Sequence, residues 1–210
     1  MAEQKGFLLV TMEPPAELEE EFNDWYDMEH IPGRGGIPGF ETARRFVCIS
    51  GWPRYLALYD LAGIGVLDSP FYQQAAWSSF SPWTKRMLGK VRGQYRASGD
   101  QIYPGDRLTG ELARMVMIRF RGVPEADGEA LVAALRESYE SRKEILQLRV
   151  LRSNYADRIE HLALVETRLP LLDPRPDANA LGALMERIDL VNEYAPYWRR
   201  GPLAGVFTTS

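Results

Sequence analysis

Along the chain, short apolar segments alternate with longer segments in which hydrophobic and polar residues are mixed. Residues 7–12 (FLLVTM) form an apolar run with β-branched members that ends at two prolines, which is typical of a buried strand. Pro15 and the acidic residues after it predict the start of a helix, whose apolar positions recur every three to four residues as far as Trp25. The prolines and glycines of residues 32–39 predict that this helix ends at Glu29-His30.

The rest of the first half completes a β-α-β-β-α-β order. Two strands joined by a tight Gly-Trp-Pro turn come first, followed by two helical pieces, the first of which has a Ser-Pro cap, and then by a fourth strand. These segments are residues 40–50, 54–61, 67–76, 82–89 and 92–103. The order is that of a ferredoxin-like unit.

The same order starts again after Leu112. The expected strands are residues 113–120, 146–154, 159–167 and 202–209, and the expected helices are residues 124–139 and 177–191. YLALYD at residues 55–60 aligns with HLALVE at 161–166, and Arg44–Ser50 aligns with Arg149–Tyr155, in each case on the same element of the repeated order. We interpret this as a duplication, with a first unit over residues 1–103, a linker over 104–111 and a second, degenerate unit over 112–210.

Each predicted four-stranded sheet carries both of its helices on one face and must bury the other. The economical solution is to pack that face against the sheet of the other half. The sequence therefore predicts an α+β fold in which two tandem ferredoxin-like (βαββαβ) units pair their sheets into an α/β-barrel with the helices outside.

The composition of the chain indicates which classes of partner and which cellular compartment to expect. The 210 residues are 45% hydrophobic and 26% charged, with a formal net charge of −4 and no basic face, so a packed core is expected and nucleic acid and membrane surfaces are not expected partners. Cys48 is the single cysteine, which excludes an intrachain disulfide and fits a reducing compartment. No run is long enough to span a membrane and the N-terminus does not resemble a secretion signal, so a cytoplasmic protein is expected.

His30, one of two histidines, is the sharpest candidate for chemistry. At the C-terminal end of the first predicted helix, the helix dipole and a nearby carboxylate such as Asp27 or Glu29 favour the charged imidazolium. An imidazole that faces a cavity can act as a general acid or base on a carbonyl or phenol substrate. The alternative is a C-capping histidine bonded to the free carbonyl groups of the helix end.

Two tyrosines and two arginines lie on the strands that follow. Tyr55 and Tyr59 share one face of their strand, whereas Arg44 and Arg45 point to opposite faces of theirs, so at most one of these arginines looks into a cavity. We expect Tyr59 and Arg45 to position the substrate or to stabilise developing negative charge. The alternatives are tyrosines of the core, and an arginine that is solvated or paired with the acidic first helix.

Aromatic side chains could line an apolar substrate pocket. Trp25, Tyr26, Tyr55 and Trp77 are the candidates for substrate binding, with packing in the core as the alternative for each.

Other kinds of site are not predicted. The two histidines lie far apart with no matching carboxylate spacing, so no metal site is expected. The glycine-rich residues 33–36 leave a helix instead of entering one and do not form a phosphate loop. Cys48 lies in an apolar strand, where it behaves as a small hydrophobe. We therefore expect no built-in cofactor.

The run WYDMEHIPGRGGIPGF, followed by ARRF and RYLALYDL, resembles the first helix and hairpin of the dimeric α/β-barrel superfamily, in particular of EthD-type and related uncharacterised bacterial members. The matching residues are Trp25, His30, Pro32 and Ile37-Pro38-Gly39. The resemblance covers Phe7 to about Tyr103, and the second half matches in topology alone. It implies a cavity between sheet and helices for a small, often aromatic, molecule. Proteins of this superfamily commonly pair, which implies a homodimer. If the two halves complete a barrel within one chain, a monomer is sufficient.

Three functions are compatible with these observations. The first is a cofactor-independent lyase, isomerase or cyclase that acts on a small aromatic or polyketide-like molecule, with His30 as the proton-transfer residue. The second is a non-catalytic carrier or sensor of similar ligands. The third is a monooxygenase-like or haem-handling member, and fold analogy alone does not choose among the three.

Overall fold

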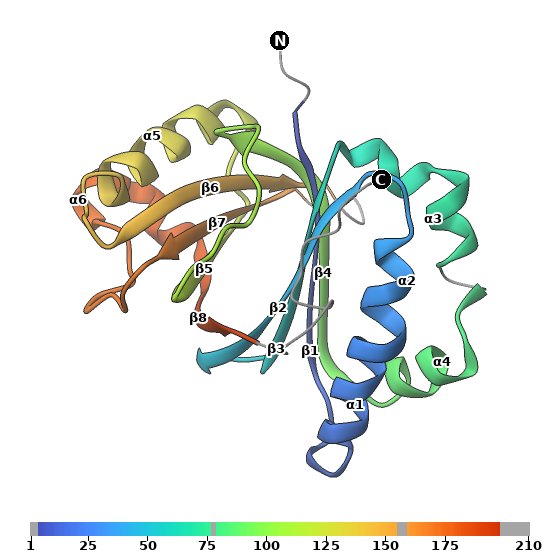
Figure 1. Ribbon diagram of the computed structural model, residues 1–210. Helices are drawn as coiled ribbons and strands as arrows, with labels where there is room; N and C mark the ends of the chain where they lie inside the picture. Colours follow the sequence, from blue (N-terminus) through green and yellow to red (C-terminus); the bar gives the residue numbers. More distant parts are fainter. Residues whose placement is uncertain (1–3, 77–78, 155–158, 198–210) are drawn as a thin grey trace.

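The computed structural model describes residues 4–76, 79–154 and 159–197, in which eight antiparallel strands close into a barrel with helices outside it (Figure 1). The strands are β1 (Gly6–Glu13), β2 (Phe40–Ser50), β3 (Tyr55–Leu61), β4 (Arg92–Tyr103), β5 (Arg114–Arg121), β6 (Ile145–Ser153), β7 (Glu160–Thr167) and β8 (Ile188–Pro196). Their order around the barrel is β1-β3-β2-β8-β5-β7-β6-β4. The predicted α+β barrel of two paired sheets is confirmed.

The helices lie on two opposite sides of the barrel. They are α1 (Glu19–Trp25), a π-helical turn (Tyr26–His30), α2 (Ile31–Gly35), α3 (Pro70–Gln74), α4 (Pro82–Leu88), α5 (Gly128–Tyr139) and α6 (Ala178–Leu181). Helices α1 to α4 cover the outer face of the sheet formed by β1 to β4, and α5 and α6 lie over the other sheet (Figure 1). None of the helices in the described ranges is long and apolar enough to cross a membrane.

The two halves have the same strand order and the same register. The first sheet runs β4-β1-β3-β2 and the second β8-β5-β7-β6, and the sheets join where β2 meets β8 and β4 meets β6. In the first half Arg44 lies opposite Leu58, and in the second half Arg149 lies opposite Leu164. These are the pairs that the sequence alignment of the two halves places in equivalent positions.

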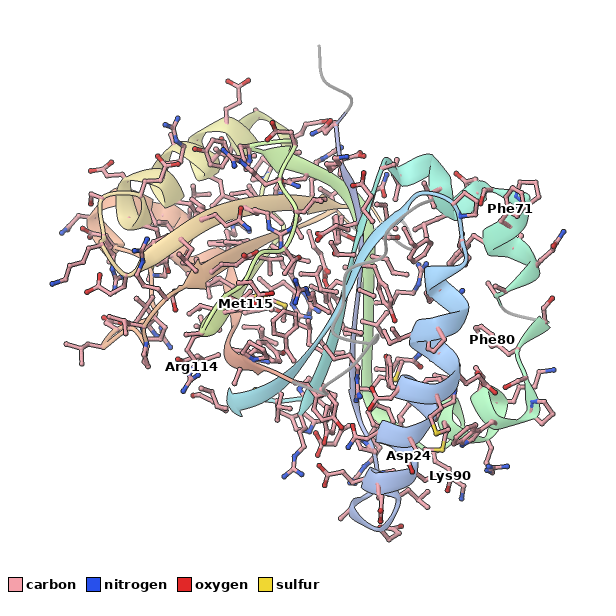
Figure 2. All side chains as sticks on the ribbon, in the orientation of Figure 1. Asp24, Phe71, Phe80, Lys90, Arg114 and Met115 are labelled. Carbon is pink, nitrogen blue, oxygen red and sulfur yellow. The ribbon has the colours of Figure 1, made fainter. Side chains whose placement is uncertain are left out.

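The alternation of side chains on each strand separates three hydrophobic cores. On β3, Leu56 and Leu58 point into the barrel, whereas Tyr55 and Tyr59 point outward to the helices. The barrel interior contains side chains of both halves, among them Phe7 from the first half and Met115 from the second. Figure 2 shows Met115 in the space between the two sheets. Each such fully buried large apolar side chain stabilises the fold by about 1.5–3 kcal/mol.

A buried cluster of charges occupies one end of the barrel interior. The guanidinium of Arg149 donates hydrogen bonds to Asp60 on β3 and to Glu166 on β7, each at 2.7 Å, and to the hydroxyl of Thr109 at 2.8 Å. The backbone N–H groups of Thr109 and Gly110, in the segment between β4 and β5, donate to the same two carboxylates at 2.7 and 3.1 Å. The cluster therefore ties both halves of the chain to the segment that connects them.

The C-terminal part of the second half differs from the prediction. The helix predicted over residues 177–191 ends early: α6 stops at Leu181, a 3-10 segment covers Gly182–Arg187, and β8 begins at Ile188. Gly182 has a positive φ of 52°, which interrupts the helix, and the residues from Ile188 onward pair with both β5 and β2, which closes the barrel. The strand predicted at residues 202–209 lies outside the described residues.

Candidate functional site

The helix that carries His30 continues beyond it. The chain passes through one π-helical turn at Tyr26–His30 and then enters α2, which contains Pro32 at its start. A π-helical turn is wider than an α-helical one, so the missing N–H and the ring of a proline at this point are accommodated without ending the helix. The prediction that the helix ends at His30, and with it the C-capping alternative, is therefore wrong. Arg34 consequently lies one turn after His30 on the same face of the helix.

A cleft of about 200 Å³ lies between this helix and the segment that leads from α3 to α4. Its lining combines ionisable groups, hydroxyls and one aromatic ring, from Glu29, His30, Gly33, Arg34, Ala75, Ser79, Phe80, Ser81 and Thr84. Phe80 lies on the α3–α4 connection beside α2 (Figure 2). The cleft is smaller than the roughly 300–1,000 Å³ of pockets for drug-sized ligands, so it suits an occupant of about one or two rings.

His30 is held as a neutral imidazole. Burial, followed by the positive charges of Arg34 and Arg45, holds the pKa of His30 well below its usual value. Its ring packs against Trp25 and Tyr26, with ring centroids 4.7 and 5.1 Å apart. The expectation of a charged imidazolium is therefore reversed, because the helix does not end here and cations, not carboxylates, dominate the surroundings of the ring.

Arg34 supplies a positive charge to the cleft. Its side chain is buried, donates a hydrogen bond to the backbone carbonyl of Ala75 at 3.2 Å and lies 5.0 Å from the ring centroid of Tyr72. Within the described ranges no carboxylate forms an ion pair with this guanidinium. A buried arginine without a carboxylate partner favours an anion, or an oxygen atom that becomes negative, in the space beside it.

A chain of hydrogen bonds fixes the opposite wall of the cleft. The indole N–H of Trp25 donates to the hydroxyl oxygen of Thr84 at 3.0 Å, and the Thr84 hydroxyl donates to Oε1 of Glu29 at 2.8 Å. Ser81 donates to the same oxygen at 2.5 Å and accepts the backbone N–H of Thr84 at 2.9 Å as the N-cap of α4. Glu29 and the two hydroxyls are therefore held in one arrangement at the start of α4.

Arg45, and not Arg44, faces the helix layer, but its charge is already balanced. The guanidinium donates to Asp27 at 2.9 Å and to the side-chain oxygen of Asn23 at 2.6 Å, and it lies 4.2 Å from the ring centroid of Tyr197. Both side chains of the Arg45–Asp27 pair are about 95% buried. This is the ion pair with the acidic first helix that the sequence offered as the alternative to a catalytic role.

The predicted tyrosines and tryptophans lie behind the cleft. The Tyr55 hydroxyl donates to Glu19 at 2.6 Å, whereas the hydroxyl of Tyr59 is buried and has no partner among the described residues. Burial raises the pKa of Tyr26 to about 12 and that of Tyr59 well above its usual value, so both phenols are neutral. Trp25 is fully buried in the same core, and Trp77 lies outside the described residues. Of the predicted residues within the described ranges, His30 is the one that lines the cleft.

Sequence reasoning did not find Arg34, Ser81 or Thr84, and it considered Glu29 only as a charge near His30. The spacing of His30 and Arg34 would place them on one helical face, but the prolines and glycines around Arg34 were interpreted as a turn. The hydroxyls of Ser81 and Thr84 were not recognised as part of a site. A serine that precedes a proline at the start of a helix is already explained by its role as the N-cap.

The comparisons with known proteins identify the fold. No family model matches the chain, and no curated protein matches it. Among solved structures it is similar to an anthrone oxidase-like protein, with a TM-score of 0.65 at 11% identity over 93% of this chain and 92% of that one. It is also similar to a protein provisionally named a chlorite dismutase (TM-score 0.56, 10% identity, 93% and 96% coverage). A third is provisionally named a monooxygenase, from Lactobacillus acidophilus NCFM (TM-score 0.53, 11% identity, 93% and 94% coverage).

The chain shares the fold of these proteins, an eight-stranded α+β barrel of two ferredoxin-like halves. Both sheets belong to one chain, so the barrel closes without a second copy. At identities near one in ten the likeness shows the fold alone, and the chemistry has to be argued from the cleft.

Proposed function

We propose that this protein is a monooxygenase-like enzyme that oxidises a small phenolic molecule of one or two rings without a built-in cofactor. The observation that carries the proposal is that two side chains line the same cleft. One is the neutral imidazole of His30, and the other is the guanidinium of Arg34, with which no carboxylate of the described residues forms an ion pair. A neutral imidazole can accept a proton, and a guanidinium can stabilise the oxygen anion that results.

In this reaction His30 accepts the proton of the phenol, and Arg34 holds the phenolate oxygen. The electron-rich ring carbon opposite that oxygen then transfers electrons to O2 and forms a C–O bond. The imidazolium of His30 returns its proton to the outer peroxide oxygen, which gives a hydroperoxide. Loss of water removes the hydrogen of this ring carbon together with the outer peroxide oxygen and its proton, breaks the O–O bond and leaves a second carbonyl group. One oxygen atom of O2 enters the quinone product, the other leaves as water, and the substrate supplies all the electrons.

The low pKa of His30 is compatible with this role. In the free protein, Arg34 and Arg45 disfavour a third positive charge on the imidazole. A phenolate that forms beside Arg34 offsets this repulsion, so the imidazolium becomes favourable only together with the substrate anion. Proton transfer is thereby coupled to formation of the reactive species.

Two of the similar structures support oxidation over the alternatives. One is named an anthrone oxidase-like protein and another provisionally a monooxygenase, whereas none of the three described above is named a lyase, isomerase or cyclase. Oxidation therefore replaces lyase, isomerase or cyclase chemistry as the leading interpretation. Membership of the EthD-type group, and pairing into a homodimer, stay predictions.

A haem does not fit the described cavities. The macrocycle with its side chains requires a flat slot toward the upper end of the roughly 300–1,000 Å³ range of ligand pockets. The cleft beside His30 encloses about 200 Å³, and the ring of His30 is packed against Trp25 and Tyr26. The pocket beside the second histidine, His161, is about 410 Å³ and is also too small. No step of the proposed reaction uses haem.

The test is O2 uptake with 1-naphthol, a phenol of two rings, followed by detection of 1,4-naphthoquinone. We expect His30→Gln and Arg34→Met to lower the rate of O2 uptake at least about a hundredfold, as is typical for removal of a proton-transfer or charge-stabilising group. Arg136→Met, at an exposed helical ion pair far from the cleft in sequence, is the matched control and should keep the wild-type rate.

Binding of naphthol without turnover in the wild-type protein would contradict the proposal and support a carrier. Equal rates for wild type and His30→Gln would also contradict it. Melting temperatures measured on the same samples separate loss of chemistry from loss of fold.

A further inference from the structure

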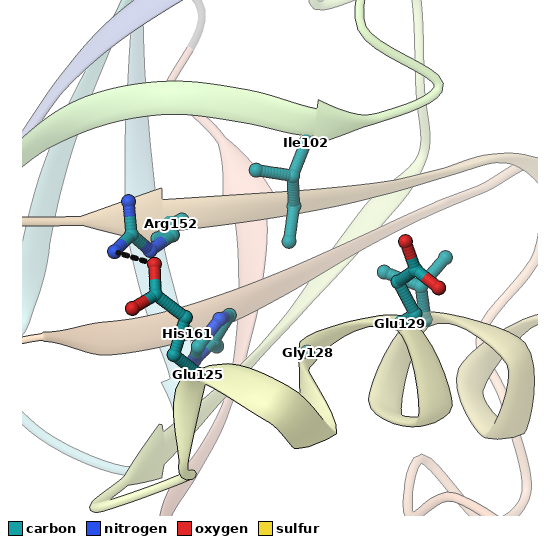
Figure 3. Close-up of a pocket in the computed structure, with 7 residues that line it drawn as sticks. Ile102, Glu125, Gly128, Glu129, Arg152 and His161 are labelled. Atoms are coloured by element: carbon teal, nitrogen blue, oxygen red, sulfur yellow. Dashed lines mark hydrogen bonds and ion pairs between the residues drawn. The ribbon is translucent and has the colours of Figure 1, made fainter.

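A second pocket lies in the other half of the barrel protein, on the outer face of its sheet. It encloses about 410 Å³, twice the volume of the cleft beside His30 and within the range of about 300–1,000 Å³ for small-molecule sites. Its polar groups come from Glu125, Glu129, Arg152 and His161 (Figure 3). Ile102 and Val132 contribute apolar side chains to the lining. The proposed oxidation does not use any of these residues.

One residue of the pocket lining has a buried nitrogen without a hydrogen-bond partner among the described residues. His161, on β7, is 98% buried, and its Nδ1 has no hydrogen-bond partner among the described residues. Burial and the positive charge of Arg152 lower the pKa of His161, so its ring is neutral and one of its nitrogens carries a hydrogen. A buried polar atom without a partner costs free energy, and a ligand oxygen that accepts a hydrogen bond from Nδ1 would remove that cost.

The N-terminus of α5 opens onto the same pocket. This helix has twelve residues, and the Asp127 side chain at its N-cap makes no capping hydrogen bond. Gly128, the first residue of the helix, lies against the imidazole: a Cβ at this position would be 3.7 Å from Nε2 of His161. The chain enters α5 from the 3-10 turn Glu125–Asp127, and the N–H of Gly128 donates to the carbonyl of Glu125. The positive end of the helix dipole is therefore what favours a negatively charged ligand group here.

Arg152 adds a positive charge to the pocket, and the carboxylate that pairs with it is held only weakly. Its guanidinium contacts Glu125 at 3.1 Å (Figure 3), but the Glu125 side chain is 80% exposed. An exposed ion pair of this kind contributes little to stability, so a ligand carboxylate can replace Glu125 at Arg152 at small cost. Glu125 therefore occupies the position that an incoming carboxylate would take.

We propose that this pocket is a second ligand site, which binds a small carboxylic acid with an apolar body. The ligand carboxylate takes the place of Glu125 at Arg152 and accepts a hydrogen bond from Nδ1 of His161 beside the N-terminus of α5. The apolar body lies along Ile102 and Val132. The site is separate from the His30 cleft, and its occupancy does not depend on the oxidation proposed there.

The two histidines of the chain make the test direct, because each reports on one pocket. The imidazole resonances of the full-length protein are followed by proton–nitrogen NMR while benzoate is added, with benzylamine as the probe of matched size and opposite charge. We expect benzoate to shift the His161 resonances saturably, and benzylamine to leave them unchanged. Assignment comes from the spectra of His161→Gln and His30→Gln.

Three variants then test the mode of binding. Glu125→Gln should tighten benzoate binding about two- to fivefold, because it removes the competing carboxylate. Arg152→Met should weaken binding about tenfold or more, because a charge-assisted hydrogen bond is lost. Gly128→Ala places a methyl group at the mouth of the pocket in ordinary contact with the imidazole; it should weaken binding while the melting temperature stays level or rises.

Three results would overturn the proposal. These are a benzoate shift confined to His30 or absent from both histidines, tighter binding of benzylamine than of benzoate, and weaker benzoate binding in Glu125→Gln. All three results are measured as ligand binding, so none of them decides whether the protein oxidises a phenol at the His30 cleft.

Discussion

Replacement of Arg149 by methionine should destabilise the protein more than any change at its exposed ion pairs. Arg149, Asp60 and Glu166 are each 1% exposed or less, and Arg149 makes a 2.7 Å contact with each of the two carboxylates. The substitution leaves both carboxylates buried without a cation. Removal of one partner of a buried ion pair costs about 3–5 kcal/mol. For a domain of this size that lowers the melting temperature by on the order of 10 °C.

Urea and thermal unfolding, followed by circular dichroism, measure this loss, and Arg136→Met is the control. Arg136 forms an exposed pair with Glu140 one helical turn away, so its replacement should leave the free energy of unfolding close to that of the wild type. A second variant, Arg149→Met with Asp60→Asn and Glu166→Gln, removes the charges together and should recover part of the lost stability. A loss below about 1 kcal/mol for Arg149→Met would refute the reasoning.

The pH dependence of the loss has a definite sign. Burial alone would raise the pKa of Asp60, but Arg149 and the hydrogen bonds from Thr42 and Thr109 bring it below its usual value. In the wild type this carboxylate therefore stabilises the fold above its unfolded pKa, and the stabilisation is lost as the pH falls through the folded pKa. Without Arg149 the pKa rises and protonation becomes favourable in the folded state. The gap between wild type and Arg149→Met should therefore narrow as the pH falls.

Three further predictions concern single side chains. Tyr59→Phe removes a buried hydroxyl that has no partner within the described part of the chain, so it should leave urea stability level or raise it by up to about 1 kcal/mol. Tyr55→Phe loses the hydrogen bond to Glu19 and should cost about 1 kcal/mol. Gly99→Ala puts a Cβ 2.0 Å from a backbone oxygen of β6 and should cost more than about 2 kcal/mol, but Gly33→Ala, with nothing within 4 Å, should not lower stability. Because the pKa of His30 is low, kcat/KM should hold as the pH falls through the usual histidine range and decline only below it; a decline centred on that range would contradict the assignment.

Much of the fold could be predicted because the local signals agreed with the tertiary structure. The predicted strands at residues 40–50 and 92–103 coincide with β2 and β4, since each is bounded by glycine or proline turns and carries β-forming residues. The alignment of residues 55–60 with 161–166 correctly placed β3 and β7 in equivalent positions. Two sheets, each with one uncovered apolar face, then left a barrel as the economical arrangement.

The site was harder to predict because it depends on features that are not local. After the π-helical turn the helix continues past Pro32, and Arg34 therefore lies on the same helical face as His30. Proline and glycine residues at this spacing usually indicate that a helix ends. The low pKa of His30 depends on the cations around it, one of which, Arg45, comes from a separate strand. The pairing of Arg45 with Asp27 follows from which face of β2 meets the helices, which alternation alone does not decide.

The most direct test of the account is oxidation of 1-naphthol under isotopically labelled O2, with mass spectrometry of the quinone. The account predicts one labelled oxygen atom in each 1,4-naphthoquinone formed by the wild-type protein, and no product above the spontaneous background with His30→Gln. Label that comes from water instead of O2, or the same rate of product formation in both proteins, would contradict it.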